Sequence, residues 1–138
     1  MEYSTLAEHA EHYAKEKHRA TAQMYDGKHP YEYHLSMVAA RAVKWAHLLP
    51  LDERDLALAI AWVHDLIEDA RLTYNDIRAE LGDAVADGAY ALTQEKGRSR
   101  AERECPRYFA GIRKSRVYIF AKLCDRGANI QYGVENPN

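Results

Sequence analysis

The sequence places a histidine and three carboxylates inside an otherwise apolar stretch. Residues 62–69 read Trp-Val-His-Asp-Leu-Ile-Glu-Asp, and the run before them, residues 56–63, is almost wholly apolar. A charge buried without a partner is strongly disfavoured, so acids in such places are normally paired with another group or bound to a metal. The segment therefore indicates a functional cluster within what otherwise reads as helical core.

Wound as a continuous helix, this segment gathers its polar groups on one side. His64 and Glu68 lie one turn apart, as do Asp65 and Asp69. The neighbours His64 and Asp65 are about 100° apart around the helix axis, so both can reach one ion between adjacent helices. An imidazole and a carboxylate suit divalent ions such as Mn²⁺, Fe²⁺, Co²⁺ or Zn²⁺.

Two further polar residues interrupt apolar helical patterns and complete a candidate ligand set. His34 starts an amphipathic segment, and Asp125 follows the apolar run that contains "YIFA". Two histidines and two aspartates that leave positions open for water would make a catalytic metal site rather than a closed structural one. Glu68 and Asp69 could then orient or deprotonate a metal-bound water.

Each of these residues also has an ordinary structural interpretation. The alternatives are a hydrogen-bonded core histidine at His64, a helix cap at His34, an ion pair of Asp125 with Arg126 or Lys122, and a solvated helix end at Glu68 and Asp69. Because the histidine and acids are clustered, we favour the interpretation as ligands and catalytic acids.

Helices are the elements that must position these side chains. Gly27 and Pro30 mark a loop over residues 25–31, and "VYIF" alone would fit a strand, but it has no alternating partner, so the chain is predicted to be all-α. The first predicted helix is capped by Ser4 or Thr5 and ends at about Gln23, and a later short helix runs from a capping box at Thr73 and Asp76 to about Leu81. A further helix is predicted around Pro106. The other predicted helices cover residues 33–48, about 53–68, 83–93 and 115–133.

Composition limits the class of protein. The 138 residues fit one domain, 1–138, and the net charge of −2 provides no basic field for nucleic acid or a membrane surface. No segment reaches the roughly 20 apolar residues of a membrane span, and the N-terminal segment lacks the apolar core of a signal peptide. The two cysteines form no CxxC motif, which favours reduced thiols. We therefore expect a cytoplasmic protein.

The candidate ligands also form a known motif. His34, His64-Asp65 and Asp125 resemble the H…HD…D signature of HD-domain metal phosphohydrolases, and "HDLIED" resembles the HDxxED motif of RelA/SpoT-type small alarmone hydrolases. Other segments resemble that family's blocks in the same order and at similar spacing. They are "AKEKHR", "DGKHPYEYH", "LTYNDIRAELGDAV", "ALTQEK" and "AKLCDRGANI".

The resemblance implies a compact HD-domain bundle of about six to seven helices. It implies one Mn²⁺, or another divalent metal, on His34, His64, Asp65 and Asp125, with Glu68 and Asp69 activating water. The reaction would release pyrophosphate from the 3′ position of a nucleotide, most simply guanosine 3′,5′-bis(diphosphate). The implied substrate contacts are Asn129 at the nucleotide sugar and phosphates, Tyr31 beside the pocket, and the cations Lys17 and Arg126, which fall in matched blocks.

The sequence departs from the family at two points. Gln23 stands where the family usually has an arginine against the guanine ring, and glutamine cannot supply a cation–π contact. The family also continues with further helices after the DRxxN block, whereas this sequence ends at Asn138. A trimmed pocket, closure by a partner subunit in a homo-oligomer, and a longer native chain are all open. The alternative functions are an HD nucleotidase or dNTP phosphohydrolase, and a non-catalytic sensor of metal or nucleotide.

Overall fold

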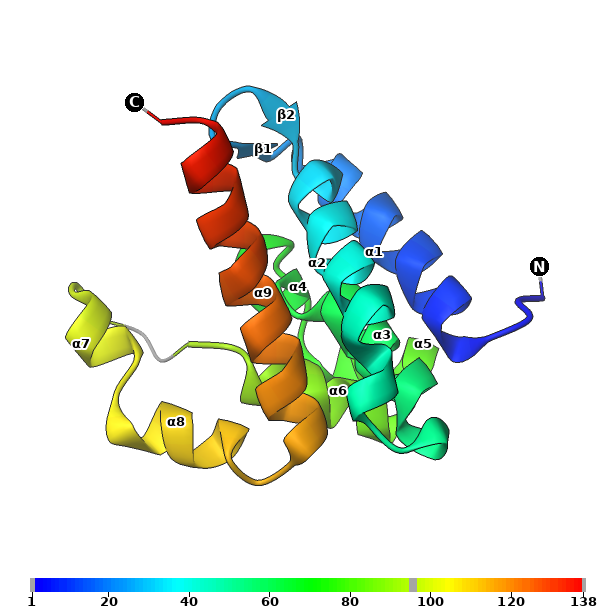
Figure 1. Ribbon diagram of the computed structural model, residues 1–138. Coiled ribbons are helices and arrows are strands. Elements are labelled where there is room, and N and C mark those ends of the chain that lie inside the picture. The colour runs from blue at the N-terminus through cyan, green and yellow to red at the C-terminus, as the bar shows by residue number, and fades with distance from the viewer. Residues whose placement is uncertain (1, 95–96, 138) are drawn as a thin grey trace.

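The computed structural model describes residues 2–94 and 97–137, and helices dominate them (Figure 1). Two short strands, β1 (Met24–Tyr25) and β2 (His29–Pro30), pair antiparallel. The helices are α1 (Leu6–Thr21), α2 (Glu32–Trp45), α3 (Arg54–Val63), α4 (Leu66–Asp69), α5 (Tyr74–Leu81), α6 (Asp83–Ala91), α7 (Arg100–Arg103), α8 (Pro106–Ile112) and α9 (Arg116–Glu135), with 3-10 turns η1 (Ala46–Leu48) and η2 (Leu51–Glu53). Because α4 and α7 are single turns of four residues, the seven longer helices agree with the predicted six to seven.

Several helix boundaries follow from local signals in the sequence. The Thr5 side chain accepts a hydrogen bond from the amide of Glu8 and caps α1. Thr73 and Asp76 form the predicted capping box of α5. Pro106 is the first residue of α8, where its missing N–H costs nothing. These three predictions are confirmed.

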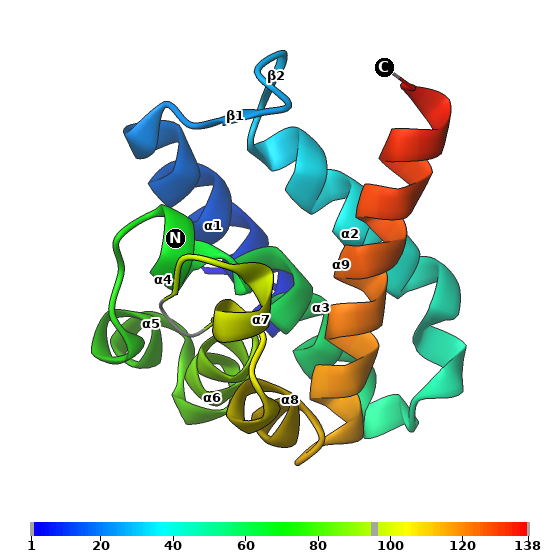
Figure 2. The same ribbon diagram turned by 90° about the vertical axis from the view of Figure 1, so that its left-hand side faces the viewer.

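Helix α3 is the centre of the fold. It contacts α1, α2, α6 and α9, and its residues from Ala59 to Val63 are all buried. Two apolar clusters share this helix, one towards α1, α5 and α6 and the other towards α2 and α9. Figures 1 and 2 show α9 running the length of the molecule beside α2 and α3. The C-terminal end of α3 therefore lies where α2 and α9 can both reach it.

The predicted helix over 53–68 is not continuous. Helix α3 ends at Val63, Asp65 has φ −104° and ψ 3°, and α4 begins at Leu66. The cause is local: His64 Nδ1 lies 2.7 Å from the carbonyl oxygen of Ala61, the acceptor that an unbroken helix would offer to the amide of Asp65. The expectation of four polar groups along one helix face is therefore wrong, and the histidine and first aspartate occupy a turn.

Smaller differences concern the segments on either side of α2. The predicted loop over 25–31 overlaps the β1–β2 hairpin, which begins at Met24 and has Asp26 and Gly27 at positive φ in its turn. The predicted helix over 33–48 ends at Trp45 and continues as η1. "VYIF" lies within α9 and is helical, so the all-α prediction holds there.

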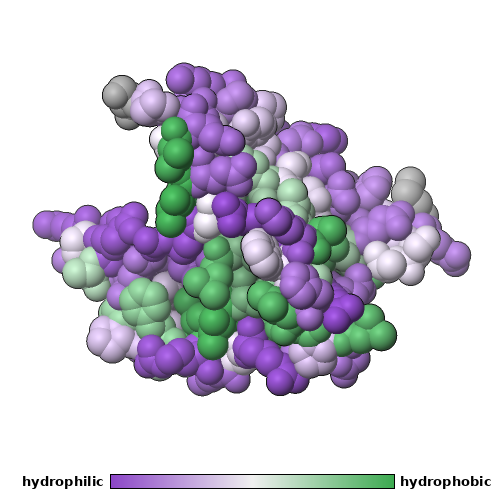
Figure 3. Space-filling view, in the orientation of Figure 1, coloured by the Kyte–Doolittle hydropathy of each residue, from purple (hydrophilic) through white to green (hydrophobic). Residues whose placement is uncertain are grey.

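Apolar side chains remain exposed on the face where α9 lies in front (Figure 3). On α9 itself they are Ile119, Leu123, Ile130 and Val134. Among the described residues, no helix combines the length and apolar character that a membrane crossing requires.

Candidate metal centre

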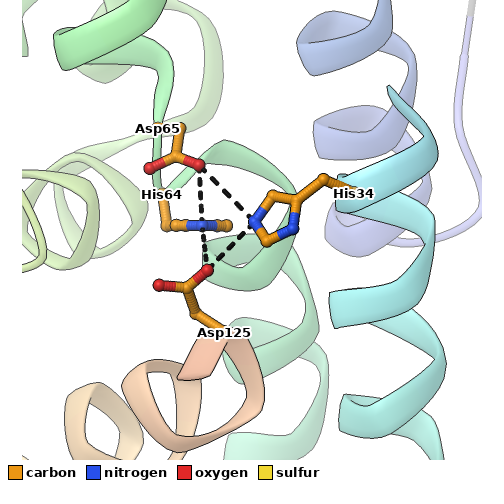
Figure 4. Close-up of side chains that lie close together, drawn as sticks. All are labelled: His34, His64, Asp65 and Asp125. Atoms are coloured by element: carbon orange, nitrogen blue, oxygen red, sulfur yellow. Dashed lines mark hydrogen bonds and ion pairs between the residues drawn. The ribbon is translucent and has the colours of Figure 1, made fainter. Parts of the chain in front are cut away.

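The structure brings all four predicted ligands together from three parts of the chain (Figure 4). His34 lies in the first turn of α2, His64 and Asp65 in the turn after α3, and Asp125 in the middle of α9. Both histidines are 2% exposed, and the two aspartate side chains are 14% exposed. In Figure 4 the four side chains converge on one point.

The distances between the ligand atoms suit one cation. His34 Nε2 lies 3.0 Å from Asp125 Oδ1 and 3.8 Å from Asp65 Oδ2. His64 Nε2 lies 3.2 Å and 3.0 Å from the same two oxygens. Ligands about 2.0–2.2 Å from an ion are about 3 Å apart when adjacent and up to about 4.4 Å apart when opposite. All four atoms lie within 4.8 Å of one another, so small shifts would complete a coordination shell.

The hydrogen bonding of His64 supports its role as a ligand. Its Nδ1 donates to the Ala61 carbonyl, which leaves Nε2 with a free lone pair in the neutral ring and turns it towards the two aspartates. Two imidazole nitrogens and two carboxylate oxygens are a donor set that borderline divalent ions accept. The residues present therefore fit a divalent metal.

The electrostatics of the cluster call for positive charge at its centre. Burial alone would lower the pKa of His64, but Asp65 and Asp125 outweigh it and hold that pKa well above its usual value. Burial would likewise raise the pKa of Asp65 and Asp125, yet the charge of His64 keeps both below their usual range. A divalent cation bound between the ligands would supply this charge and displace the proton that the two aspartates favour on His64.

The acidic pair lies beside the ligands. Asp65, Glu68 and Asp69 each offer an oxygen within 4.8 Å of the others. Burial raises the pKa of Glu68 to about 7, and the charges of Asp65 and Asp69 add to this effect, whereas the hydrogen bond from the Gln94 amide opposes it. Part of the Glu68 side chain is open to solvent. Burial and Asp65 also raise the pKa of Asp69. A carboxylate with a pKa near neutrality is suited to accept a proton from water.

Aromatic side chains line the cluster on the side of the hairpin. Tyr31 donates its hydroxyl to Asp65 Oδ2 at 2.5 Å and stacks on His18. His18 is 2% exposed, and burial lowers its pKa to about 4, so this imidazole is neutral at pH 7. Tyr25 stacks on His34 and donates to Asn129 Oδ1 at 2.7 Å. The rings thus hold one histidine ligand and one aspartate ligand in place.

The predicted substrate residues fall into two groups. Gln23 and Tyr31 line a cavity of about 290 Å³ together with His18, and a hydrogen bond joins Gln23 to Asp69. Asn129 is linked to the cluster through Tyr25, which donates a hydrogen bond to Asn129 and stacks on His34. Lys17 contacts Glu16 and Tyr13, and Arg126 is half exposed with its Nη1 3.9 Å from Glu104 Oε1. The structure therefore brings Gln23 and Tyr31 to the acidic cluster, whereas the described contacts of the two cations are with other residues.

Sequence reasoning missed one residue that contacts a ligand and one that is linked to the site through its neighbours. Tyr25 stacks on a ligand, but nothing in its sequence context distinguishes it from the neighbouring tyrosines. Glu104 is 7% exposed and contacts Gln94, Lys122 and Arg126, yet it lies in a segment of mixed charge typical of a solvated loop. Its contacts come from segments distant in the sequence: Gln94 after α6, and Lys122 and Arg126 on α9.

Comparisons with known proteins bear on the fold. No model of a protein family matches the sequence, and no curated protein is significantly similar to it. A solved structure does match, described as "A metazoan ortholog of SpoT hydrolyzes ppGpp and plays a role in starvation responses". The identity is 22%, the TM-score is 0.77, and the match covers 99% of this chain and 75% of that chain. The chain thus shares the helical fold of this metazoan protein, and the predicted all-α HD-domain fold is confirmed.

Proposed function

We propose that this protein is a metal-dependent phosphohydrolase that removes pyrophosphate from the 3′ position of guanosine 3′,5′-bis(diphosphate). One observation carries the proposal: the imidazole nitrogens and carboxylate oxygens of His34, His64, Asp65 and Asp125 converge within 4.8 Å, with two further acids beside them. The shared fold with a metazoan protein that hydrolyses ppGpp supports the choice of substrate. Mn²⁺ is the metal that the motif implies.

The proposed metal would be held by the two histidines and two aspartates of the cluster. When bound, a divalent cation supplies Lewis acidity that acidifies a water molecule and polarises a phosphoryl group. In the proposed reaction water attacks the phosphorus next to the ribose 3′ oxygen and the bond between this phosphorus and the 3′ oxygen breaks. The 3′ oxygen takes up a proton from solvent, and pyrophosphate is released. The nucleotide keeps its 5′-diphosphate and gains a 3′-hydroxyl.

The protein's own groups divide the remaining work. Glu68 accepts the proton that the attacking water loses, because its raised pKa matches a base that works near neutral pH. Asp69, which a hydrogen bond joins to Gln23, orients the water. Tyr31 fixes Asp65 through its hydroxyl. The cavity beside Tyr31 and Gln23 is large enough for part of a nucleotide base.

Gln23 favours a second candidate. A glutamine amide in the cavity wall can hydrogen-bond several bases, so an HD nucleotidase or dNTP phosphohydrolase is the alternative enzyme. A sensor without catalysis is a third reading. It needs the ligands but has no use for Glu68 and Asp69, so the acidic pair favours chemistry.

A nucleotide panel tests these three functions. Protein loaded with Mn²⁺ is incubated with 3′-pyrophosphorylated guanosine nucleotides and with ordinary 5′-nucleotides. Pyrophosphate, orthophosphate and triphosphate are measured separately, and nucleotide binding is measured by calorimetry. The proposal predicts pyrophosphate from the 3′-pyrophosphorylated nucleotides only. Orthophosphate or triphosphate from a 5′-nucleotide would favour the alternative enzyme, and binding without turnover would favour the sensor.

A further inference from the structure

Glu104 is a buried carboxylate that the proposed reaction does not use. It lies in the turn between α7 and α8, and its side chain is 7% exposed. Its Oε2 accepts a hydrogen bond from Gln94 Nε2 at 2.8 Å and lies 3.5 Å from Lys122 Nζ. Its Oε1 lies 3.9 Å from Arg126 Nη1. Because a buried carboxylate is costly without partners, these contacts keep Glu104 in one position.

Two of the contacts lead back to the metal centre. Gln94 bonds Glu104 through its side chain and donates its backbone N–H to Glu68 Oε1 at 2.5 Å. Lys122 Nζ lies 4.0 Å from Asp125 Oδ2 and also sits over the ring of Tyr108. The route through Gln94 consists of two short hydrogen bonds, whereas the route through Lys122 consists of two longer contacts between charges. We therefore place the tighter coupling at Glu68.

Glu68 depends on such an external contact for its position. It belongs to α4, a single turn of four residues, in which the amide of Asp69 bonds to Asp65 and the amide of Ala70 bonds to Leu66. A long side chain on so short a helix has several rotamers open to it, and each hydrogen bond from outside removes some of them. The backbone amide of Gln94 provides one such bond. Gln94 lies just after the end of α6, and its side chain is bonded to Glu104.

We propose that Glu104 is a positioning residue for the catalytic carboxylate: through Gln94 it holds the amide that orients Glu68. The inference rests on the proposed function for its kinetic consequence, although the geometric link stands by itself. The competing interpretation is that Glu104 only fastens α7 and α8 to α9. The two differ in whether the loss of Glu104 acts through Glu68.

Three variants separate the interpretations. Glu104→Ala removes the acceptor, Gln94→Ala cuts the side-chain link but keeps the backbone amide, and Glu104→Gln keeps an oxygen that can accept from Gln94. We expect the two alanine variants to lower kcat on the order of 10- to 100-fold, since small misplacements of a reacting group have effects of this size. KM and Mn²⁺ affinity should stay within about threefold, and Glu104→Gln should recover most of the rate.

The decisive comparison repeats Gln94→Ala and Glu104→Ala in a Glu68→Gln background. If Glu104 acts through Glu68, neither change lowers the remaining kcat further, because the Glu68→Gln variant has already lost the carboxylate that Gln94 and Glu104 position. An equal fold-loss in both backgrounds would overturn the inference. Glu102→Gln, an exposed acid on α7, is the matched control and should keep the wild-type rate. Circular dichroism checks folding, and Gln94→Ala carries the test if Glu104→Ala does not fold.

Amide hydrogen exchange tests the link without turnover. In Glu104→Ala the amide of Gln94 should exchange at least about tenfold faster, while the core amides of α1 and α3 keep their protection. Unchanged exchange at Gln94 would overturn the inference. A wild-type protein that hydrolyses no nucleotide would instead count against the proposed function, and the exchange at Gln94 would still decide the role of Glu104.

Discussion

Replacement of Glu68 by glutamine separates proton transfer from metal binding. Burial and the neighbouring acids Asp65 and Asp69 raise the pKa of Glu68 to about 7, so the carboxylate is about half ionised at neutral pH. Only the ionised form accepts a proton. Wild-type kcat/KM should therefore rise roughly tenfold per pH unit at low pH and level off above the pKa of Glu68. Because a bound cation lowers this pKa, the midpoint should lie at or below about 7.

The Glu68→Gln variant should lose this acid limb and fall in kcat on the order of 10²- to 10⁴-fold, the usual contribution of a general base. Its Mn²⁺ affinity, measured by calorimetry, should stay within a few-fold of wild type, because Glu68 is not among the four converging ligands. Glu135→Gln, at the exposed end of α9, is the control. Wild-type kcat in Glu68→Gln, or an unchanged acid limb, would refute the assignment.

Three other changes probe the ligands and the core. Asp65→Ala should abolish Mn²⁺ binding by calorimetry, and measurable binding at wild-type affinity would remove Asp65 from the ligand set. Because the pKa of His64 lies well above its usual value, protons compete with the metal: affinity should fall as pH falls, and calorimetry in buffers of different ionisation enthalpy should detect proton release. Gly88→Ala would bring a Cβ within 2.3 Å of Ile60 Cδ1, so urea denaturation should show a loss of about 1–3 kcal/mol, whereas Gly111→Ala, with open space around it, should not destabilise the protein.

The sequence predicts most of the fold because its helix signals are local. The cap at Thr5, the capping box at Thr73 and the proline that opens α8 each act within one turn of chain. The break after α3 could not be predicted from periodicity, because it depends on a contact between the His64 imidazole and the Ala61 carbonyl that replaces a backbone hydrogen bond. Apolar periodicity continues through the break and conceals it.

The ligand set was predictable because histidine and aspartate within apolar helices are rare without a purpose. His34, His64 and Asp125 each interrupt such a pattern, and the structure gathers them. Residues that act through tertiary contacts gave no such signal. Glu104 reads as one acid among many charges, and only the packing of distant segments places it against Gln94.

A crystal of the protein soaked in manganese tests the central claim most directly. Anomalous scattering should reveal one strong peak about 2.0–2.3 Å from the Nε2 atoms of His34 and His64 and from one oxygen each of Asp65 and Asp125. No peak at this position, or four side chains that point away from one another, would contradict the proposed metal centre and the hydrolase built on it.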